Sequence, residues 1–385
     1  MWNPDTQVAR ARGVSALRSL AQAFRDVGFT EEAATGALSA ESPAELLSNT
    51  AFYAFCSADQ VSELVMSPAG VMIQLFVRNG DVPRDRYAQV VPAALRGLLA
   101  TLGLVSEEGD AVTPAVSVSP GCSMYFLSDQ LFRSDTRVAM ARRSTLVMPP
   151  HASSFELLDN LGAVGGRLVD VGCGCGVLAL ALRERCSSVV GVDLNPRAVA
   201  YSQVNALVNG AGAGSGASAD LGTGVESGAG AEFHLADLRS GLAVDGLADH
   251  LIFNSPTGPA HHSEAEIGWM TAEHALRFVV TAMPRVLRPG GVAEVLLIVE
   301  VPRDRPSATE LVRSWLPEDP DVGVAELRGS PLAISPDAVT RGRLDPGCLM
   351  ADSADEAARL IGHLRARGIH EVVPALVTLT LPSLS

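Results

Sequence analysis

An aspartate and three glycines form the pattern in this sequence that is best suited to holding a small ligand. Asp170 ends an apolar run, and glycines follow at positions 172, 174 and 176. Glycine has no Cβ, so a ligand can approach its backbone closely, and a helix that opens there offers unpaired N–H groups. A dinucleotide fingerprint needs a further glycine at position 177, which is valine here. The carboxylate of Asp170 would repel a pyrophosphate, but it suits the ammonium group of an amino-acid ligand.

Three more polar residues follow later apolar runs. Asp193 could accept both hydroxyls of a ribose, because a carboxylate has two acceptor oxygens. Asp237 is placed to accept from an adenine amino group, and Asn254 ends the next run. Ligands of open α/β sheets bind at the edge where the parallel strands end, so we expect these side chains and Asp170 at one such edge.

The elements that must position these residues begin at about residue 160, where short apolar runs alternate with helical stretches. This alternation predicts a parallel sheet. The expected strands cover residues 167–171, 188–192, 232–235, 250–253 and 291–299. A helix at 354–367 and a strand at 371–381 would supply the last edge of the sheet. The Gly/Ala/Ser-rich residues 210–230 are typical of a flexible surface insertion.

The pattern of residues 7–118 is mostly helical, with Thr30 as a predicted N-cap and an apolar stripe over 90–102. A predicted hairpin at 104–112 completes the outline of a winged helix-turn-helix. That hairpin carries Glu107, Glu108 and Asp110, whose charge has the wrong sign for contact with phosphates. We therefore expect a substrate lid or a dimer surface here, and no DNA reader.

The motifs, in their order, resemble class I S-adenosylmethionine-dependent methyltransferases over roughly residues 145–300, and among them the group called "methyltransferase small". The resemblance implies a Rossmann-like, mostly parallel sheet of seven strands behind a mainly helical, winged-helix-like N-terminal domain. It divides the chain into residues 1–145 and a methyltransferase domain, 146–385, whose C-terminal extension covers about 301–385. It also implies S-adenosylmethionine as the cofactor and S-adenosylhomocysteine as the product.

The same resemblance assigns the site residues. The cofactor would contact Asp170, Gly172, Cys173, Gly174, Gly176, Asp193, Leu194, Asp237, Leu238 and Asn254. The substrate would contact Asn254, Ser255, Pro256 and Thr257, which stand where the group has Asn-Pro-Pro followed by Tyr or Phe. Thr257 thus offers a hydroxyl in place of the ring that stacks on a planar amide or base, which favours a smaller, more polar acceptor.

Methyl transfer from a sulfonium needs little from a protein beyond in-line geometry. We expect Asn254 to orient the acceptor atom. His261 or His262, in the loop that follows, could remove a proton from it, or the pair could simply be exposed. No metal is expected, because the close pair Cys173 and Cys175 is joined by no second pair and no histidine cluster.

Composition limits the partners. The 385 residues carry a net charge of −14, and all 29 of their cationic side chains are arginine. So acidic a chain repels nucleic acid as a partner. No stretch resembles a signal peptide or a membrane span, and scattered cysteines suit a reducing compartment, so a cytoplasmic location without membrane contact is expected. The sequence is compatible with a homodimer.

Three functions remain open. The favoured one is methylation of a nitrogen or oxygen of a small molecule, such as a specialised natural-product metabolite; Asn254 favours nitrogen. The alternative is N-methylation of a macromolecule, either an rRNA base or a protein glutamine. The third is a non-enzymatic regulator that joins a winged-helix module to a nucleoside-sensing domain.

Overall fold

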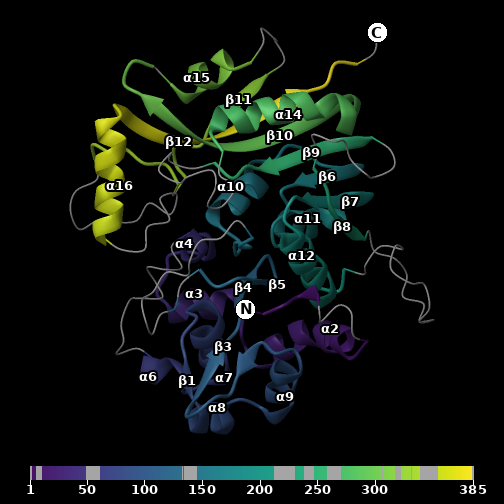
Figure 1. Ribbon diagram of the computed structural model, residues 1–385, viewed down its shortest axis with the longest axis vertical. Helices are drawn as coiled ribbons and strands as arrows, with labels where there is room; N and C mark the ends of the chain where they lie inside the picture. The colour runs from purple at the N-terminus through teal and green to yellow at the C-terminus, as the bar shows by residue number, and fades with distance from the viewer. Residues whose placement is uncertain are drawn as a thin grey trace.

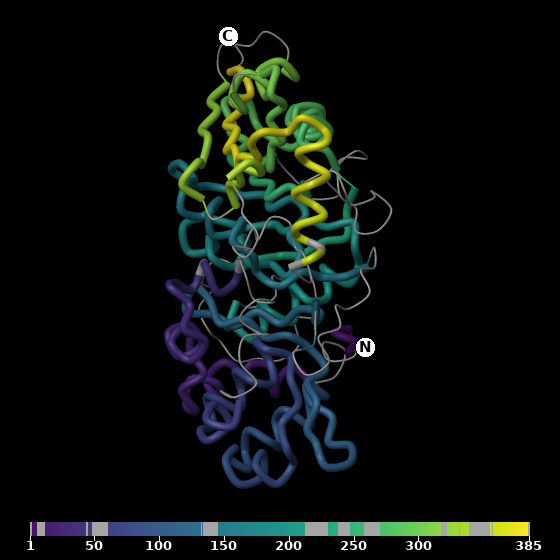
Figure 2. Tube along the Cα trace, turned by 90° about the vertical axis from the view of Figure 1, so that its left-hand side faces the viewer, coloured from purple at the N-terminus to yellow at the C-terminus, as the bar shows by residue number. Residues whose placement is uncertain are grey.

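The computed structural model describes residues 2–5, 11–48, 61–131, 133, 145–211, 230–237, 247–257, 270–305, 307–316, 322–330, 332–338 and 354–383. Figure 1 shows the N-terminal helices at one end of the long axis and a large sheet towards the other. Figure 2, a quarter turn away, shows the same arrangement, with the C-terminal strands and helix farthest from the N-terminal helices.

The described residues form a seven-stranded sheet in the order β11-β12-β10-β9-β6-β7-β8. Its strands are β6 (Arg167–Val171), β7 (Ser188–Asp193), β8 (Ala231–Leu235), β9 (Ala248–Asn254), β10 (Leu287–Pro302), β11 (Gly323–Glu326) and β12 (Ile369–Thr380). Strands β6 to β10 pair in parallel, whereas β12 runs antiparallel to β10 and β11. The expected Rossmann-like, mostly parallel sheet of seven strands is therefore confirmed. Strand β11 was not among the expected strands.

Alternation along the strands gives the sheet two apolar faces. Leu168 of β6 belongs to a cluster with α11 (Val177–Leu182) and α12 (Pro196–Val208), on the side that also carries α10 (Ala152–Asn160). Its neighbour Val169 belongs to the opposite cluster, with α14 (Ala272–Val286) and α15 (Ala308–Ser314). The last helix, α16 (Ala354–Ala366), packs on β12 around a smaller cluster. Helices on both faces leave the strand ends as the place for a ligand.

The N-terminal module, residues 11–114, is mainly helical. Its elements are α2 (Ala11–Asp26), α3 (Glu31–Ala37), α4 (Pro43–Ser48), α6 (Val61–Leu64), α7 (Pro68–Met72), the π-helix η2 (Ile73–Val77), β1 (Val82–Pro83), α8 (Arg84–Val90), α9 (Ala93–Thr101), β2 (Val105–Ser106) and β3 (Ala111–Pro114). Thr30 caps α3 as predicted, since its hydroxyl accepts from Ala33 N at 3.2 Å. The stripe predicted over 90–102 is split between α8 and α9, because Pro92 lies between the two helices.

In the order of its elements, helices followed by a hairpin, the N-terminal module agrees with the winged-helix outline. Strands β2 and β3 follow the helices and pair antiparallel, and β1 joins them in the order β1-β3-β2. Assignment to the winged-helix fold, and the domain division at residue 145, stay predictions.

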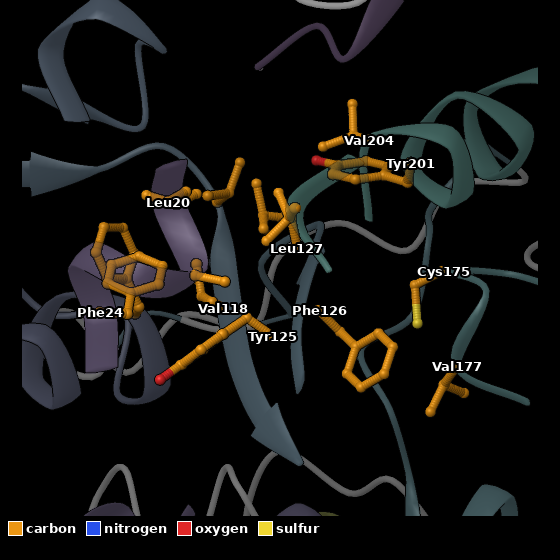
Figure 3. Packing of buried hydrophobic residues seen from close by; sticks show 14 of the residues in the cluster. Leu20, Phe24, Val118, Tyr125, Phe126, Leu127, Cys175, Val177, Tyr201 and Val204 are labelled. Carbon is orange, nitrogen blue, oxygen red and sulfur yellow. The ribbon is translucent and has the colours of Figure 1, made fainter. Parts of the chain in front are cut away.

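A second hairpin, which the sequence analysis did not foresee, lies between the module and the sheet. It consists of β4 (Ser117–Gly121) and β5 (Met124–Ser128). Figure 3 shows Val118, Tyr125 and Leu127 of this hairpin between Phe24 of α2 and Val204 of α12. A single apolar cluster therefore runs from the N-terminal module, through the hairpin, to the helices of the sheet.

Two asparagines of α12 bind the backbone of β5. Asn205 Oδ1 accepts from Leu127 N at 2.8 Å, and its Nδ2 donates to Leu127 O at 3.0 Å. Asn209, the C-cap residue, repeats this with Tyr125, at 2.9 Å and 2.8 Å. Four helical residues advance about 6 Å and two strand residues about 6.6 Å, so alternate residues of β5 meet every fourth residue of α12.

We expect Asn205→Ala to lower the free energy of unfolding by on the order of 3 kcal/mol. Asn205 is fully buried and also donates to Cys175 O at 2.8 Å, so its loss leaves three buried backbone groups without their partner. Urea denaturation would measure this. Asn160→Ala is the control, because Asn160 makes one exposed bond, to Glu156 O, and its loss should change stability by less than about 0.5 kcal/mol. Equal effects of the two substitutions would contradict the role given to Asn205.

Candidate cofactor and methyl-transfer site

A cavity of about 680 Å³ opens at the carboxyl edge of the parallel strands. Gly172, Asp193, Asp237 and Asn254 line it, each at or just after the end of a different strand. Residues 145–149, between the second hairpin and α10, form a further part of its wall. The structure thus brings together the strand ends that the sequence predicts at one site.

Asp170 lies beneath this cavity and does not line it. Its side chain is 1% exposed, and Oδ2 accepts from Ala179 N, in α11, at 3.1 Å. Among the residues that the structure describes, none donates to Oδ1. Burial therefore raises the pKa of Asp170 to about 8, more than the bond from Ala179 lowers it. The Oδ1 atom of this carboxyl therefore has no hydrogen-bond donor beside it among the described residues.

The glycine turn above Asp170 adopts backbone angles that other residues avoid. Gly172, Gly174 and Gly176 have φ of 64°, 56° and 83°. A Cβ at Gly174 would meet no atom nearer than Gly172 O at 3.9 Å, so the turn leaves room for a ligand against its backbone. Gly176 instead packs against Ser202 and Phe233 and does not line the cavity.

Cys173 contributes an uncharged side chain to the wall of the cavity. It is buried, and its Sγ lies 3.6 Å from Ser202 Oγ. Burial raises the pKa of this thiol well above its ordinary value, so it does not supply a thiolate.

Asp193 connects the glycine turn to the start of the loop that follows β7. Its Oδ2 accepts from Gly174 N at 3.0 Å and its Oδ1 from Asn195 N at 2.8 Å. Burial raises its pKa, while the backbone N–H groups of Asn195, Gly174 and Leu194 act in the opposite direction. With two acceptor oxygens, the carboxylate keeps acceptor capacity for a ligand. The next residue, Leu194, lines the cavity although its side chain is 63% exposed, which suits contact with a flat apolar ring.

The amide of Asn254 is fixed by two serines of α10. Its Nδ2 donates to Ser153 Oγ at 3.0 Å and to Ser154 Oγ at 3.2 Å. Within the described ranges nothing donates to Asn254 Oδ1, so this oxygen is available as an acceptor. Sequence reasoning missed both serines. The signal available was their place in the first turn of a helix capped by His151, another residue of the cavity wall.

The remainder of the 254–257 motif lines the cavity but is bound to the sheet. Ser255 Oγ donates to Leu296 O at 2.6 Å, and Ser255 O accepts from Thr257 N at 2.7 Å. Thr257 Oγ1 accepts from Ile298 N at 2.8 Å. The Thr257 hydroxyl therefore binds the backbone of β10 and lies 3.0 Å from Ser255 Oγ, and its contact with an acceptor stays a prediction.

Three predicted site residues, Leu238, His261 and His262, lie outside the described residues, so their roles stay predictions. In the described ranges, no group of three or more His, Cys, Asp and Glu residues could hold a metal ion. None of the helices described is long and apolar enough to cross a membrane.

Residues 150–223 match the family described as "Ribosomal protein L11 methyltransferase (PrmA)". This segment contains the glycine turn, Asp170 and Asp193, and it lies in the mostly parallel, seven-stranded sheet that the resemblance implies. The described residues form a mixed α/β fold whose mostly parallel, seven-stranded sheet is Rossmann-like. The resemblance stated from the motifs is thus confirmed, and the match supports S-adenosylmethionine as the cofactor.

Similar proteins match this chain over a limited stretch. The ribosomal protein L11 methyltransferase of Vibrio cholerae is 41% identical over 63 residues, which is 16% of this chain and 21% of that protein. That of Haemophilus ducreyi is 40% identical over 63 residues, 16% of this chain and 22% of its own. The chain therefore spans about a fifth of the length of the curated relatives it matches.

Two solved structures show a general likeness. YcgJ from Bacillus subtilis gives a TM-score of 0.37 at 16% identity, covering 61% of this chain and 100% of YcgJ. Geranyl diphosphate C-methyltransferase from Streptomyces coelicolor gives 0.34 at 16% identity, covering 58% of this chain and 78% of its own. With TM-scores this low, neither structure provides evidence about the fold beyond the strand order itself.

Titration of Asp170 should be visible in stability. A folded pKa of about 8, above an unfolded value of about 3.9, means that the fold binds the proton more tightly. The resulting stability is complete below about pH 4 and is lost as the pH rises through about 8. We expect the unfolding free energy of the wild type, relative to Asp170→Asn, to fall across this window by at most about 1.4 kcal/mol per pH unit. Urea denaturation without ligand at about pH 5 and about pH 8 measures it; a difference that does not change with pH would contradict it.

Proposed function

We propose that this protein transfers a methyl group from S-adenosylmethionine to a nitrogen atom of a protein substrate. The observation that carries the proposal is the meeting of the glycine turn, Asp193 and Asn254 around one cavity, within or next to the segment that matches a methyltransferase family. When bound, the cofactor supplies a methyl group already activated by a sulfonium. The protein then has to bind, orient and exclude water.

The residues at and beneath the cavity fit the parts of this cofactor. Asp170 does not line the cavity, but an ammonium group bound above it would lower its raised pKa through its charge. The open backbone at Gly174 leaves room for the methionine part. Asp193 has lone pairs left for the ribose hydroxyls, and Leu194 with Asp237 would contact the adenine.

At the other end of the cavity, Asn254 would orient the acceptor. With both hydrogens of its Nδ2 given to Ser153 and Ser154, the amide presents Oδ1 as an acceptor, which suits an attacking N–H. The lone pair of that nitrogen can then be directed along the line of attack. His261 and His262 remain candidates for taking the proton from an ammonium substrate.

A macromolecular acceptor is better supported than a small metabolite. The relatives that match the cofactor-binding segment are named for ribosomal protein L11. The Thr257 hydroxyl, which had favoured a small polar acceptor, is bound to Ile298 N. The net charge of −14 disfavours RNA, so a protein nitrogen is the remaining member of this class.

Binding of the cofactor is the first test. Calorimetry should detect binding of S-adenosylmethionine to the wild type, and Asp193→Asn should weaken it at least about tenfold, because a hydrogen bond to a charged group contributes about 1.5–3 kcal/mol. Glu273→Gln, in an exposed ion pair on α14, is the control and should bind as the wild type does. A wild type that does not bind the cofactor would exclude the proposed function.

The acceptor is tested with methyl-labelled cofactor offered separately to ribosomal proteins, total cell protein, RNA and small metabolites. We expect label in protein, recovered as an N-methylated amino acid after complete enzymatic digestion; a methylated glutamine amide would release labelled methylamine on acid hydrolysis. Asn254→Ala should lower kcat about 100-fold, because orientation is lost, and leave cofactor affinity within about twofold. Label found only in metabolites or only in RNA would overturn the protein acceptor.

A further inference from the structure

The carboxylate of Asp129, just after β5, is bound by three different groups. Arg197 donates from Nε to Oδ2 at 2.9 Å and from Nη2 to Oδ1 at 2.5 Å. Tyr201 OH lies 3.0 Å from Oδ1, and Val147 N donates to Oδ2 at 3.0 Å. The side chains of Asp129 and Arg197 are only 7% and 15% exposed, so this ion pair is largely shielded from water and salt.

Arg197 connects this carboxylate to the loop of Asp193. It occupies the second position of α12, two residues after Asn195, whose N–H binds Asp193 Oδ1. The first turn of a helix is an unfavourable place for a cation, because the helix dipole is positive there. Asp129 offsets both this repulsion and the burial of the guanidinium, so the start of α12 depends on a residue from the hairpin side.

Val147 connects the same carboxylate to the cavity wall. Besides the bond from its N–H, Val147 O accepts from Asp129 N at 3.1 Å. Val147 belongs to residues 145–149, which line the cavity together with the glycine turn and the Asp193 loop. Asp129 is therefore hydrogen-bonded to Val147 in the cavity wall and to Arg197, which does not line the cavity but stands between its lining residues Pro196 and Ala198.

The N-terminus joins this arrangement. Arg197 Nη2 donates to Trp2 O at 2.8 Å, and the Trp2 ring lies 5.5 Å from the Tyr201 ring. Trp2 Nε1 in turn donates to Leu102 O, at the end of α9, at 2.7 Å. The N-terminal module is thus connected to the cavity through the same ion pair.

We propose that Asp129 and Arg197 are positioning residues for the cofactor site: their ion pair fixes the 145–149 wall against the Asp193 loop. This inference rests on the proposed function. Neither residue has to touch the cofactor. Loss of the pair should let the two walls separate, which weakens cofactor binding, whereas the acceptor end around Asn254 stays in place.

Asp129→Asn should raise both Kd and KM for S-adenosylmethionine about tenfold or more, while kcat at saturating cofactor stays within about threefold. Arg197→Lys keeps the charge but loses the two-pronged contact, so it should give an intermediate rise. The matched control is Asp81→Asn, which breaks an ion pair with Arg133 of the same 2.5 Å length but away from the cavity. It should bind the cofactor as the wild type does.

Calorimetry gives Kd, initial rates give KM and kcat, and urea denaturation shows how far each variant is folded. Should Asp129→Asn not fold, Arg197→Lys carries the test alone. Affinity unchanged in the folded variants, or equally weakened in Asp81→Asn, would overturn the positioning role. A wild type without cofactor affinity would instead refute the proposed function, so the two failures are distinguishable.

Discussion

The contact between helix α12 and strand β5 is the interaction on which the other parts of this structure depend. Arg197, Tyr201, Asn205 and Asn209 follow one another at every fourth position of the chain, and all of them bind β5 or the residue just beyond it. Because side-chain amides occupy the N–H and C=O groups of β5, this hairpin strand can lie against a helix without unpaired backbone groups. Only then can the apolar residues on both sides form one core (Figure 3).

That contact also explains why the cofactor cavity is made from distant segments. The sheet alone supplies the strand ends with Asp193 and Asn254, whereas the 145–149 wall follows the hairpin in the chain. Helix α12 begins at the Asp193 loop and carries the hairpin on its outer face. Because a helix is rigid, α12 fixes the distance between the Asp193 loop at its start and the hairpin that binds its later turns.

Much of the sheet could be predicted because its strands are short apolar runs that end in polar residues, a local signal. Asp193, Asp237 and Asn254 were placed at the cavity on that basis, and the structure brings them there. Strand β11 and the β4–β5 hairpin could not be predicted, since their pairing depends on partners far away in sequence. Pro120 and Gly121 within β4 even argue locally against a strand.

Side-chain partners were the least predictable feature, as Thr257 shows. Its position in the motif suggested a substrate contact, but a backbone N–H forty-one residues away binds its hydroxyl. Asn254 could be assigned from the motif, but Ser153 and Ser154, which orient it, lie a hundred residues earlier. The spacing of Asn205 and Asn209 is visible in the sequence, yet nothing local says that a strand edge lies opposite them.

Two buried aspartates differ in how far the folded chain satisfies their oxygens. Asp129 has a guanidinium, a phenol and a backbone N–H around its two oxygens, all from this chain, so its charge is compensated in the folded protein. Asp170 is as deeply buried, but one of its oxygens has no donor among the described residues. Burying a carboxyl in that state costs free energy at neutral pH, and the fold tolerates it only because other contacts compensate. A cation that arrives with a ligand would remove this cost, so the partner missing at Asp170 favours the bound state, whereas the complete set at Asp129 keeps the cavity in shape before binding.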